Sequence, residues 1–216
     1  MAELITGLTV KGVRDQLARV QDTIASAGAD PEAVALLAAV KYVAVQELPV
    51  LAEAGITLVG ENRAQELVTK TESHGDLFTW DFIGHLQSRK VRQVLPLVRY
   101  IHSVGSDSVL EQLGRHGGPD TRVLIEVNVA GEAGKSGIAP AQLADFLDRC
   151  PVTVVGLMTM PPRAPRPQDS RPHFAALREL AQSHGLRELS MGTSQDYAVA
   201  VQEGATIIRL GSTLYH

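Results

Sequence analysis

One lysine and two glycine–serine turns stand out because each follows an apolar, strand-like segment. Lys41 comes directly after LLAAV, and its amine could act as a nucleophile if its surroundings partly desolvate it. The segment SMGTSQD contains Gly192 and Ser194, and RLGST repeats the pattern with Gly211 and Ser212. Backbone N–H groups and hydroxyls in such turns can hold a phosphate. Ordinary helix capping is the alternative for both turns.

Arg209 lies two residues before Gly211, in the apolar segment TIIRLG, and is predicted to point toward the same place. An arginine beside a pyridine nitrogen keeps that nitrogen unprotonated, because two adjacent positive charges repel. Together with Lys41 and the two turns, Arg209 therefore matches pyridoxal 5′-phosphate, whose aldehyde forms a Schiff base with lysine. The alternatives are a solvated Lys41 and a buried ion pair between Arg209 and a carboxylate.

A second phosphate-like motif, GEAGKSG, spans residues 131–137. A nucleotide-binding P-loop requires a first glycine where this chain has Val129, so the motif fails where the backbone must turn. We expect Lys135 and Ser136 to line the mouth of the site instead. Lys135 could attract an anionic ligand there, or it could be a solvated lysine in a glycine-rich turn.

Two histidines, His85 in FIGHLQSRK and His102 in IHSV, also fall at predicted strand ends. The sequence has neither HExxH nor closely spaced His/Cys pairs, so we expect hydrogen-bonding histidines near the mouth and no metal site. The basic stretch QSRKVRQ lacks interleaved aromatic residues and is predicted to be a solvated helix face rather than a nucleic-acid site.

Eight short apolar segments must position these residues. A helix is predicted over 7–28, before the first strand, from apolar residues at helical spacing. The strands are predicted in VALLAAV, ITLVGE, TWDFIG, YIHSV, RVLIEVNV, VTVVGLMTM, ELSMG and TIIRLG, with helix-like sequence between them. Eight such units favour a closed (β/α)8 barrel of the TIM type, in one domain over 1–216, above an open doubly wound sheet.

A proline-rich segment, PPRAPRPQDSRP at 161–172, follows the sixth predicted strand. It cannot run far as a helix. We expect a loop at the barrel mouth, or an irregular lead-in to a helix over about 174–183.

Composition fits a globular protein. The chain has 216 residues, of which 44% are hydrophobic and 20% charged, with a formal net charge of −4. This balance disfavours a broad electrostatic surface for nucleic acid or an anionic membrane. The N-terminal residues lack the apolar run of a secretory signal, and no stretch reaches about 18 apolar residues. We therefore expect a cytoplasmic protein.

Several motifs occur in order across nearly the whole chain: AAVKY, VGENRAQE, WDFIGHLQSRK, IHSV, EVNVAGEAGKSGI, VVGLMTM, LSMGTSQDYAVAVQEGA and IIRLGS. In these the chain resembles the YggS/PROSC family of pyridoxal-phosphate-binding proteins, whose barrel is similar to the N-terminal domain of alanine racemase (fold type III). One departure is Val40, where the family often has serine.

The resemblance implies roles for individual residues. Lys41 would carry the Schiff base and Asn62 would lie against the cofactor ring, although Asn62 could instead cap the helix that follows it. Arg209 would face the pyridine nitrogen. The phosphate would be surrounded by Gly192, Ser194, Gly211 and Ser212, with Met191 nearby.

The family also implies a function. Its members act in pyridoxal phosphate (vitamin B6) homeostasis, so this chain would hold the cofactor and buffer it or deliver it to apo-enzymes, without catalysis of its own. Alanine racemase needs a second domain and a tyrosine from it, which the residues here do not encode. Two alternatives stay open, namely a small racemase-like enzyme and a cofactor-dependent regulatory module. A monomer is the default expectation.

Overall fold

Eight parallel strands form a closed barrel in the computed structural model, which describes residues 4–215. Each strand pairs with the next along the chain, and the first closes against the eighth. The predicted (β/α)8 barrel is confirmed, and the doubly wound alternative is wrong. The strands are β1 (Ala35–Ala39), β2 (Leu58–Glu61), β3 (Thr79–Phe82), β4 (Tyr100–Val104), β5 (Arg122–Glu126), β6 (Thr153–Met158), β7 (Glu188–Thr193) and β8 (Ile207–Leu210).

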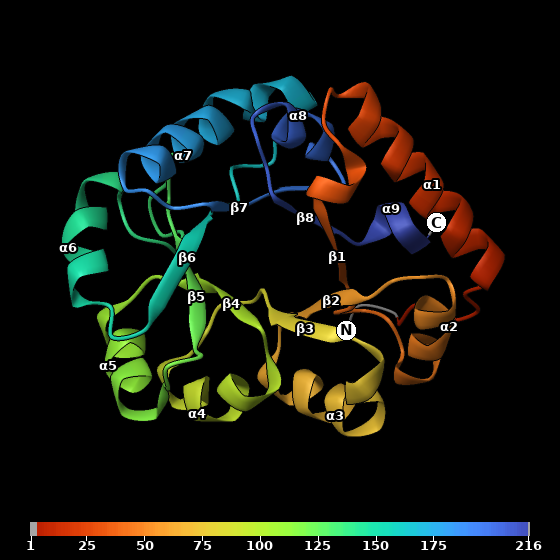
Figure 1. Ribbon diagram of the computed structural model, residues 1–216, viewed down its shortest axis with the longest axis horizontal. Helices are drawn as coiled ribbons and strands as arrows, with labels where there is room; N and C mark the ends of the chain where they lie inside the picture. Colours follow the sequence, from red (N-terminus) through yellow and green to blue (C-terminus); the bar gives the residue numbers. More distant parts are fainter. Residues whose placement is uncertain (1–3, 216) are drawn as a thin grey trace.

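Helices form an outer ring around these strands (Figure 1). They are α1 (Val10–Ser26), α2 (Leu48–Glu53), α3 (Ala64–His74), α4 (Val91–Val94), α5 (Asp107–His116), α6 (Leu143–Arg149), α7 (Arg171–Ser183), α8 (Tyr197–Gln202) and α9 (Ser212–Tyr215). The extra helix α1 is shorter than predicted because Thr9 caps it, its hydroxyl accepting the N–H of Gly12 at 3.1 Å.

Two apolar clusters form the core of the protein. The larger lies between the strands and the helices, and includes Ile208 and Leu210 of β8. The smaller lies inside the barrel and is built on Leu37, Leu58 and Ile207. Because successive strand residues face opposite sides, Arg209 shares the inward face of β8 with Ile207.

The pairing of β1 with β8 places the two ends of the predicted site together. Leu37 lies opposite Arg209 in the register of these strands. Leu37 and Ala39 share the inward face of β1, and continuing that alternation brings Lys41 to the mouth on the same side. Lys41 and Arg209 therefore come from adjacent strands at the closing seam of the barrel and face the same side.

The proline-rich segment meets both expectations, because residues 161–166 form a loop whose Arg163 lines the cavity at the barrel mouth, and the rest is a lead-in to a helix. It ends in a short 3-10 helix, Pro167–Ser170, that continues directly into α7. No helix within residues 4–215 is long and apolar enough to cross a membrane. The single domain expected over 1–216 extends beyond the described residues and stays a prediction.

Candidate functional site

A cavity of about 640 Å³ opens at the carboxyl ends of the strands. In (β/α)8 barrels this is the face at which ligands bind. Every strand, or the loop that follows it, contributes to its walls, including Lys41, Asn62, Gly84, Ser103, Glu126, Met158, Ser194, Arg209, Gly211 and Ser212. Six of the eight predicted site residues thus line one cavity, and the other two, Met191 and Gly192, lie outside its lining.

Lys41 lies just beyond β1 at the rim of the cavity. Its side chain is exposed, and its Nζ is 5.1 Å from the centre of the Tyr42 ring. The expected partial desolvation of the amine is therefore wrong for this structure. The amine is instead freely accessible to a molecule that enters the cavity.

The two glycine–serine turns contact each other directly. The Ser194 hydroxyl accepts hydrogen bonds from the backbone N–H groups of Gly211 and Thr213, each at a distance of 3.3 Å. Capping of the helix after β7 was the alternative role for Ser194, but α8 begins at Tyr197 with Asp196 at the capping position. Ser194 binds the first amides of α9 instead, and so joins the turns that follow β7 and β8.

Met191 and Gly192 build the wall behind the turn. Met191 is fully buried and packs in the layer between strands and helices. Gly192 has φ +90°, and a Cβ there would lie 2.5 Å from the Cβ of Ala200 in α8. Asp196 fixes the turn, since its Oδ1 accepts the N–H of Thr193 at 2.8 Å. Gly192 therefore lets α8 approach β7 closely.

Arg209 points into the barrel beneath the cavity, as predicted. Its Nη1 donates to the Ser190 hydroxyl, and its Nη2 donates to the carbonyl of Thr159 at 3.0 Å. Burial lowers its pKa to about 10, against the opposing charges of Glu126 and Asp196. The guanidinium stays charged at neutral pH. Its hydrogen-bond partners in the described chain are a hydroxyl and a carbonyl, so the ion-pair alternative is wrong.

Asn62 faces the cavity with one polar atom unpaired. Its Oδ1 is buried and has no hydrogen-bond partner within residues 4–215. The capping alternative is wrong, because α3 begins at Ala64 with Arg63 at the capping position. A buried amide oxygen without a partner is costly, and a ligand that donates a hydrogen bond would satisfy it.

The GEAGKSG turn contributes one of its two predicted residues to the cavity. Ser136 lines it and donates to Oε1 of Glu126 at 2.6 Å. Lys135 is not among the lining residues, and its Nζ pairs with Glu132 at 2.5 Å. Glu126 was not singled out from the sequence, where it lies inside the predicted strand RVLIEVNV.

A buried ion pair supports the start of the site. Lys70 of α3 is 2% exposed, and its Nζ contacts Oε2 of Glu61 at 2.7 Å and the carbonyl of Val40 at 2.6 Å. Oε1 of Glu61 accepts the N–H of Asn62 at 2.7 Å. One lysine therefore ties the backbone just before Lys41 to the backbone at Asn62.

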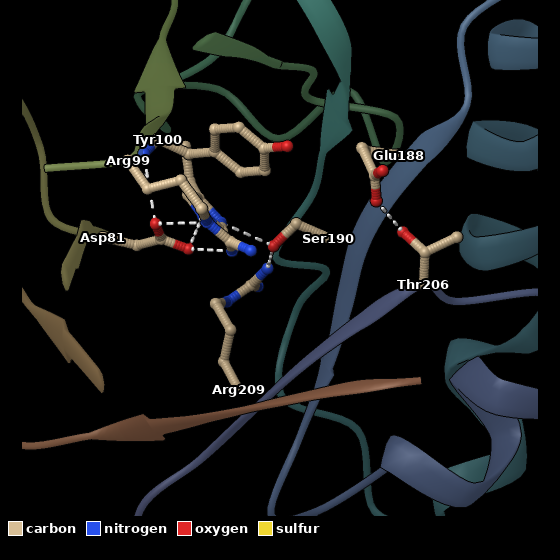
Figure 2. A network of polar contacts seen from close by, with 8 residues as sticks. Asp81, Arg99, Tyr100, Glu188, Ser190, Thr206 and Arg209 are labelled. Atoms are coloured by element: carbon tan, nitrogen blue, oxygen red, sulfur yellow. Dashed lines mark hydrogen bonds and ion pairs between the residues drawn. The ribbon is translucent and has the colours of Figure 1, made fainter. Parts of the chain in front are cut away.

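His102 lies inside the barrel rather than at its mouth, whereas His85 lines the cavity as expected. The Nδ1 of His102 is 2.8 Å from the Ser190 hydroxyl, and its Nε2 is 3.0 Å from Oδ2 of Asp81. The guanidinium of Arg99 also donates to Asp81, from Nε at 3.1 Å and from Nη2 at 2.6 Å (Figure 2). Within the described residues, no group of three or more His, Cys, Asp or Glu could hold a metal ion.

Residues 12–216 match the family model described as alanine racemase, N-terminal domain. A curated relative from Aquifex aeolicus, named pyridoxal phosphate homeostasis protein, is 38% identical over 213 residues, covering 92% of this chain and 93% of that protein. The chain belongs to the YggS/PROSC family of pyridoxal phosphate homeostasis proteins. The expected membership is confirmed.

Solved structures agree with this family. PipY of Synechococcus elongatus, described with PLP bound, is 31% identical, with a TM-score of 0.79 over 94% of this chain and 100% of its own. Alanine racemase from Corynebacterium glutamicum is 14% identical, with a TM-score of 0.74, and this chain covers 63% of it. The likeness to alanine racemase supports the barrel fold alone.

Proposed function

We propose that this protein binds pyridoxal 5′-phosphate as a Schiff base on Lys41 and serves in pyridoxal phosphate homeostasis. The single observation that carries the proposal is that Lys41, Arg209 and the two glycine–serine turns line one cavity. A lysine amine, a buried guanidinium and a set of backbone amides are complementary to an aldehyde, a pyridine nitrogen and a phosphate.

The cavity fits this cofactor in two further respects. Asn62 offers an unpaired buried amide oxygen, which is satisfied when a donor on the ligand faces it. The Ser194 hydroxyl accepts the N–H groups of Gly211 and Thr213, so both amides point toward one oxygen atom. A phosphate oxygen is the stronger acceptor for the same amides.

The exposure of Lys41 suits a carrier. An amine at an open rim can be reached by water and by other amines, so that the cofactor can be exchanged. Arg209, charged beside the pyridine nitrogen, weakens the ring as an electron sink. We propose that the protein acts as a monomer that buffers the cofactor or delivers it to apo-enzymes, without catalysis of its own.

The test is to mix purified protein with pyridoxal 5′-phosphate, record the visible absorption spectrum, reduce with borohydride and find the modified lysine by peptide mass spectrometry. We expect one phosphopyridoxyl group per chain, on Lys41. Lys41→Ala abolishes both the band and the adduct. Lys11→Ala is the matched control, because Lys11 is exposed on α1, away from the cavity.

An adduct spread over surface lysines, or a normal band in Lys41→Ala, would overturn the proposal. Transfer is tested separately by incubating the loaded protein with a PLP-dependent apo-enzyme and following the recovery of enzyme activity. Recovery no faster than from free cofactor at the same free concentration would contradict delivery.

A further inference from the structure

A line of hydrogen bonds connects Arg209 to the opposite side of the barrel interior. It runs from Arg209 of β8 through Ser190 of β7 and His102 of β4 to Asp81 of β3. All four residues are buried. Figure 2 shows Arg209 reaching toward Ser190, while Asp81 lies on the other side, beside Arg99. Three side chains from three other strands thus form a line that ends at the guanidinium of Arg209.

The donor and the acceptor of each hydrogen bond along this line can be assigned, starting from Asp81. Asp81 accepts hydrogen bonds from Arg99 and from the N–H of Tyr100, so it is held as a carboxylate. Burial would raise the pKa of Asp81, but the bonds from His102 and Arg99 outweigh it and lower that pKa. A carboxylate can only accept, so the His102 Nε2 must carry a proton.

The remaining directions follow from the state of His102. Burial lowers the pKa of His102, and its bond to Asp81 opposes this only in part, so the ring is neutral. With the proton on Nε2, Nδ1 is an acceptor and the Ser190 hydroxyl must donate to it. The lone pairs of Ser190 then face the Nη1 of Arg209.

We infer that Asp81 and His102 are positioning residues which, through Ser190, hold the Arg209 guanidinium in the orientation in which it meets the ligand. A serine hydroxyl alone can rotate and turn its hydrogen toward the arginine. His102 prevents this rotation. The carbonyl of Thr159 fixes the second guanidinium nitrogen, so Arg209 is held at two points.

The trio of aspartate, histidine and serine has the composition of a hydrolase triad, but it cannot work as one. Ser190 is fully buried and does not line the cavity, so no substrate carbonyl reaches its hydroxyl. Its oxygen already accepts from Arg209. A positioning role uses every hydrogen bond that the four side chains make.

The ligand in this inference rests on the proposed function, and the test compares four variants. Ser190→Ala removes the link to Arg209, and His102→Leu removes the acceptor. His102→Asn places an amide oxygen where Nδ1 lies. Thr206→Val is the matched control, because Thr206 also lies beside β7 and β8 but its hydroxyl pairs with Glu188, separate from this line (Figure 2).

We expect Ser190→Ala and His102→Leu to weaken the binding of pyridoxal 5′-phosphate roughly three- to tenfold. They should also shift the pH at which the absorption band of the bound cofactor changes, because the charge beside the pyridine nitrogen is no longer fixed. His102→Asn recovers part of both properties, and Thr206→Val leaves both at the wild-type values. Wild-type affinity and spectrum in Ser190→Ala would overturn the inference, even if the melting temperature fell.

Nitrogen-15 NMR of the cofactor-free protein separates this inference from the proposed function. We expect the Nε2–H tautomer of His102 in the wild type, and side-chain resonances of Arg209 that shift in Ser190→Ala and not in Thr206→Val. If the wild type forms no adduct on Lys41, the proposed function fails while these resonances still decide the inference. An Nδ1–H tautomer, or unshifted Arg209 resonances in Ser190→Ala, would disprove it.

Discussion

The Ser194 hydroxyl, just after β7, accepts a hydrogen bond from the backbone N–H of Gly211, just after β8, at a distance of 3.3 Å. The same oxygen accepts the N–H of Thr213. A single hydroxyl therefore aligns the amides of the last turn, and the two glycine–serine turns act as one unit. In the proposed site, this contact would let two sequence motifs 17 residues apart hold a single phosphate.

Ser194→Ala should lower the affinity for pyridoxal 5′-phosphate about three- to tenfold, because the variant loses the proposed hydrogen bond between the Ser194 hydroxyl and the charged phosphate. Pyridoxal, which lacks the phosphate, should lose less. Fluorescence titration with both ligands measures this difference. Ser73→Ala is the control, since Ser73 is exposed on α3. Equal losses for the two ligands would place Ser194 away from the phosphate.

Gly192→Ala should destabilise the fold by about 2–4 kcal/mol, because it combines a φ of +90° with a Cβ only 2.5 Å from that of Ala200. Gly185→Ala separates these two causes. Its φ is +65°, and nothing lies within 4 Å of the added Cβ, so we expect a loss of about 1 kcal/mol. Urea denaturation of both variants measures the difference, and equal losses would mean that α8 can move away from β7.

Lys70→Met should cost about 3–5 kcal/mol of unfolding free energy, because it leaves the buried carboxylate of Glu61 without its partner. Lys11→Met breaks an exposed pair and should cost less than about 1 kcal/mol. Adding Glu61→Gln to Lys70→Met removes the unpaired charge and should restore part of the loss. Chemical denaturation checks all three, and a double variant less stable than Lys70→Met would contradict this explanation.

The pKa of His102 gives the stability a pH dependence. Burial lowers that pKa, so below about pH 6.5 the unfolded chain binds a proton that the folded chain binds only at lower pH. The unfolding free energy should therefore fall as the pH drops from about 6.5, by at most about 1.4 kcal/mol per pH unit from this group. Asp81, whose pKa is below its ordinary 3.8, stays ionised in this window.

His102→Asn removes the titrating ring and should flatten the curve of stability against pH in that window. Urea denaturation between about pH 5 and about pH 7.5 measures the slope of each protein. Identical slopes for wild type and variant would show that His102 takes up its proton equally in both states.

The barrel and most of its site were predictable because they leave local patterns. Each buried strand is a continuous apolar run, and each run ends where the polar turn begins, so Lys41, Gly211 and Ser212 could be placed at one face. Arg209 was predicted to point inward because it lies two residues before Gly211 in an apolar strand segment, and the structure places it on the inward face with Ile207.

The support beneath the site was not predictable. Lys70 sits in the polar helix sequence AQELVTKTESH, and nothing local shows that its amine is buried against Val40. Ser190 and His102 lie 88 positions apart, and their contact depends on barrel closure. Asn62 has the residue type of a helix cap, but α3 begins one residue too late for it to cap.

The seam between β1 and β8 also ties cofactor uptake to the completion of folding. Lys41 and Arg209 come from strands at opposite ends of the barrel sequence, so they meet only after almost the whole chain has been ordered. A partly synthesised or partly folded chain therefore holds no assembled pocket. Pyridoxal 5′-phosphate would then bind only fully folded molecules. Its binding would shift the folding equilibrium toward the closed barrel, so the cofactor would stabilise the fold.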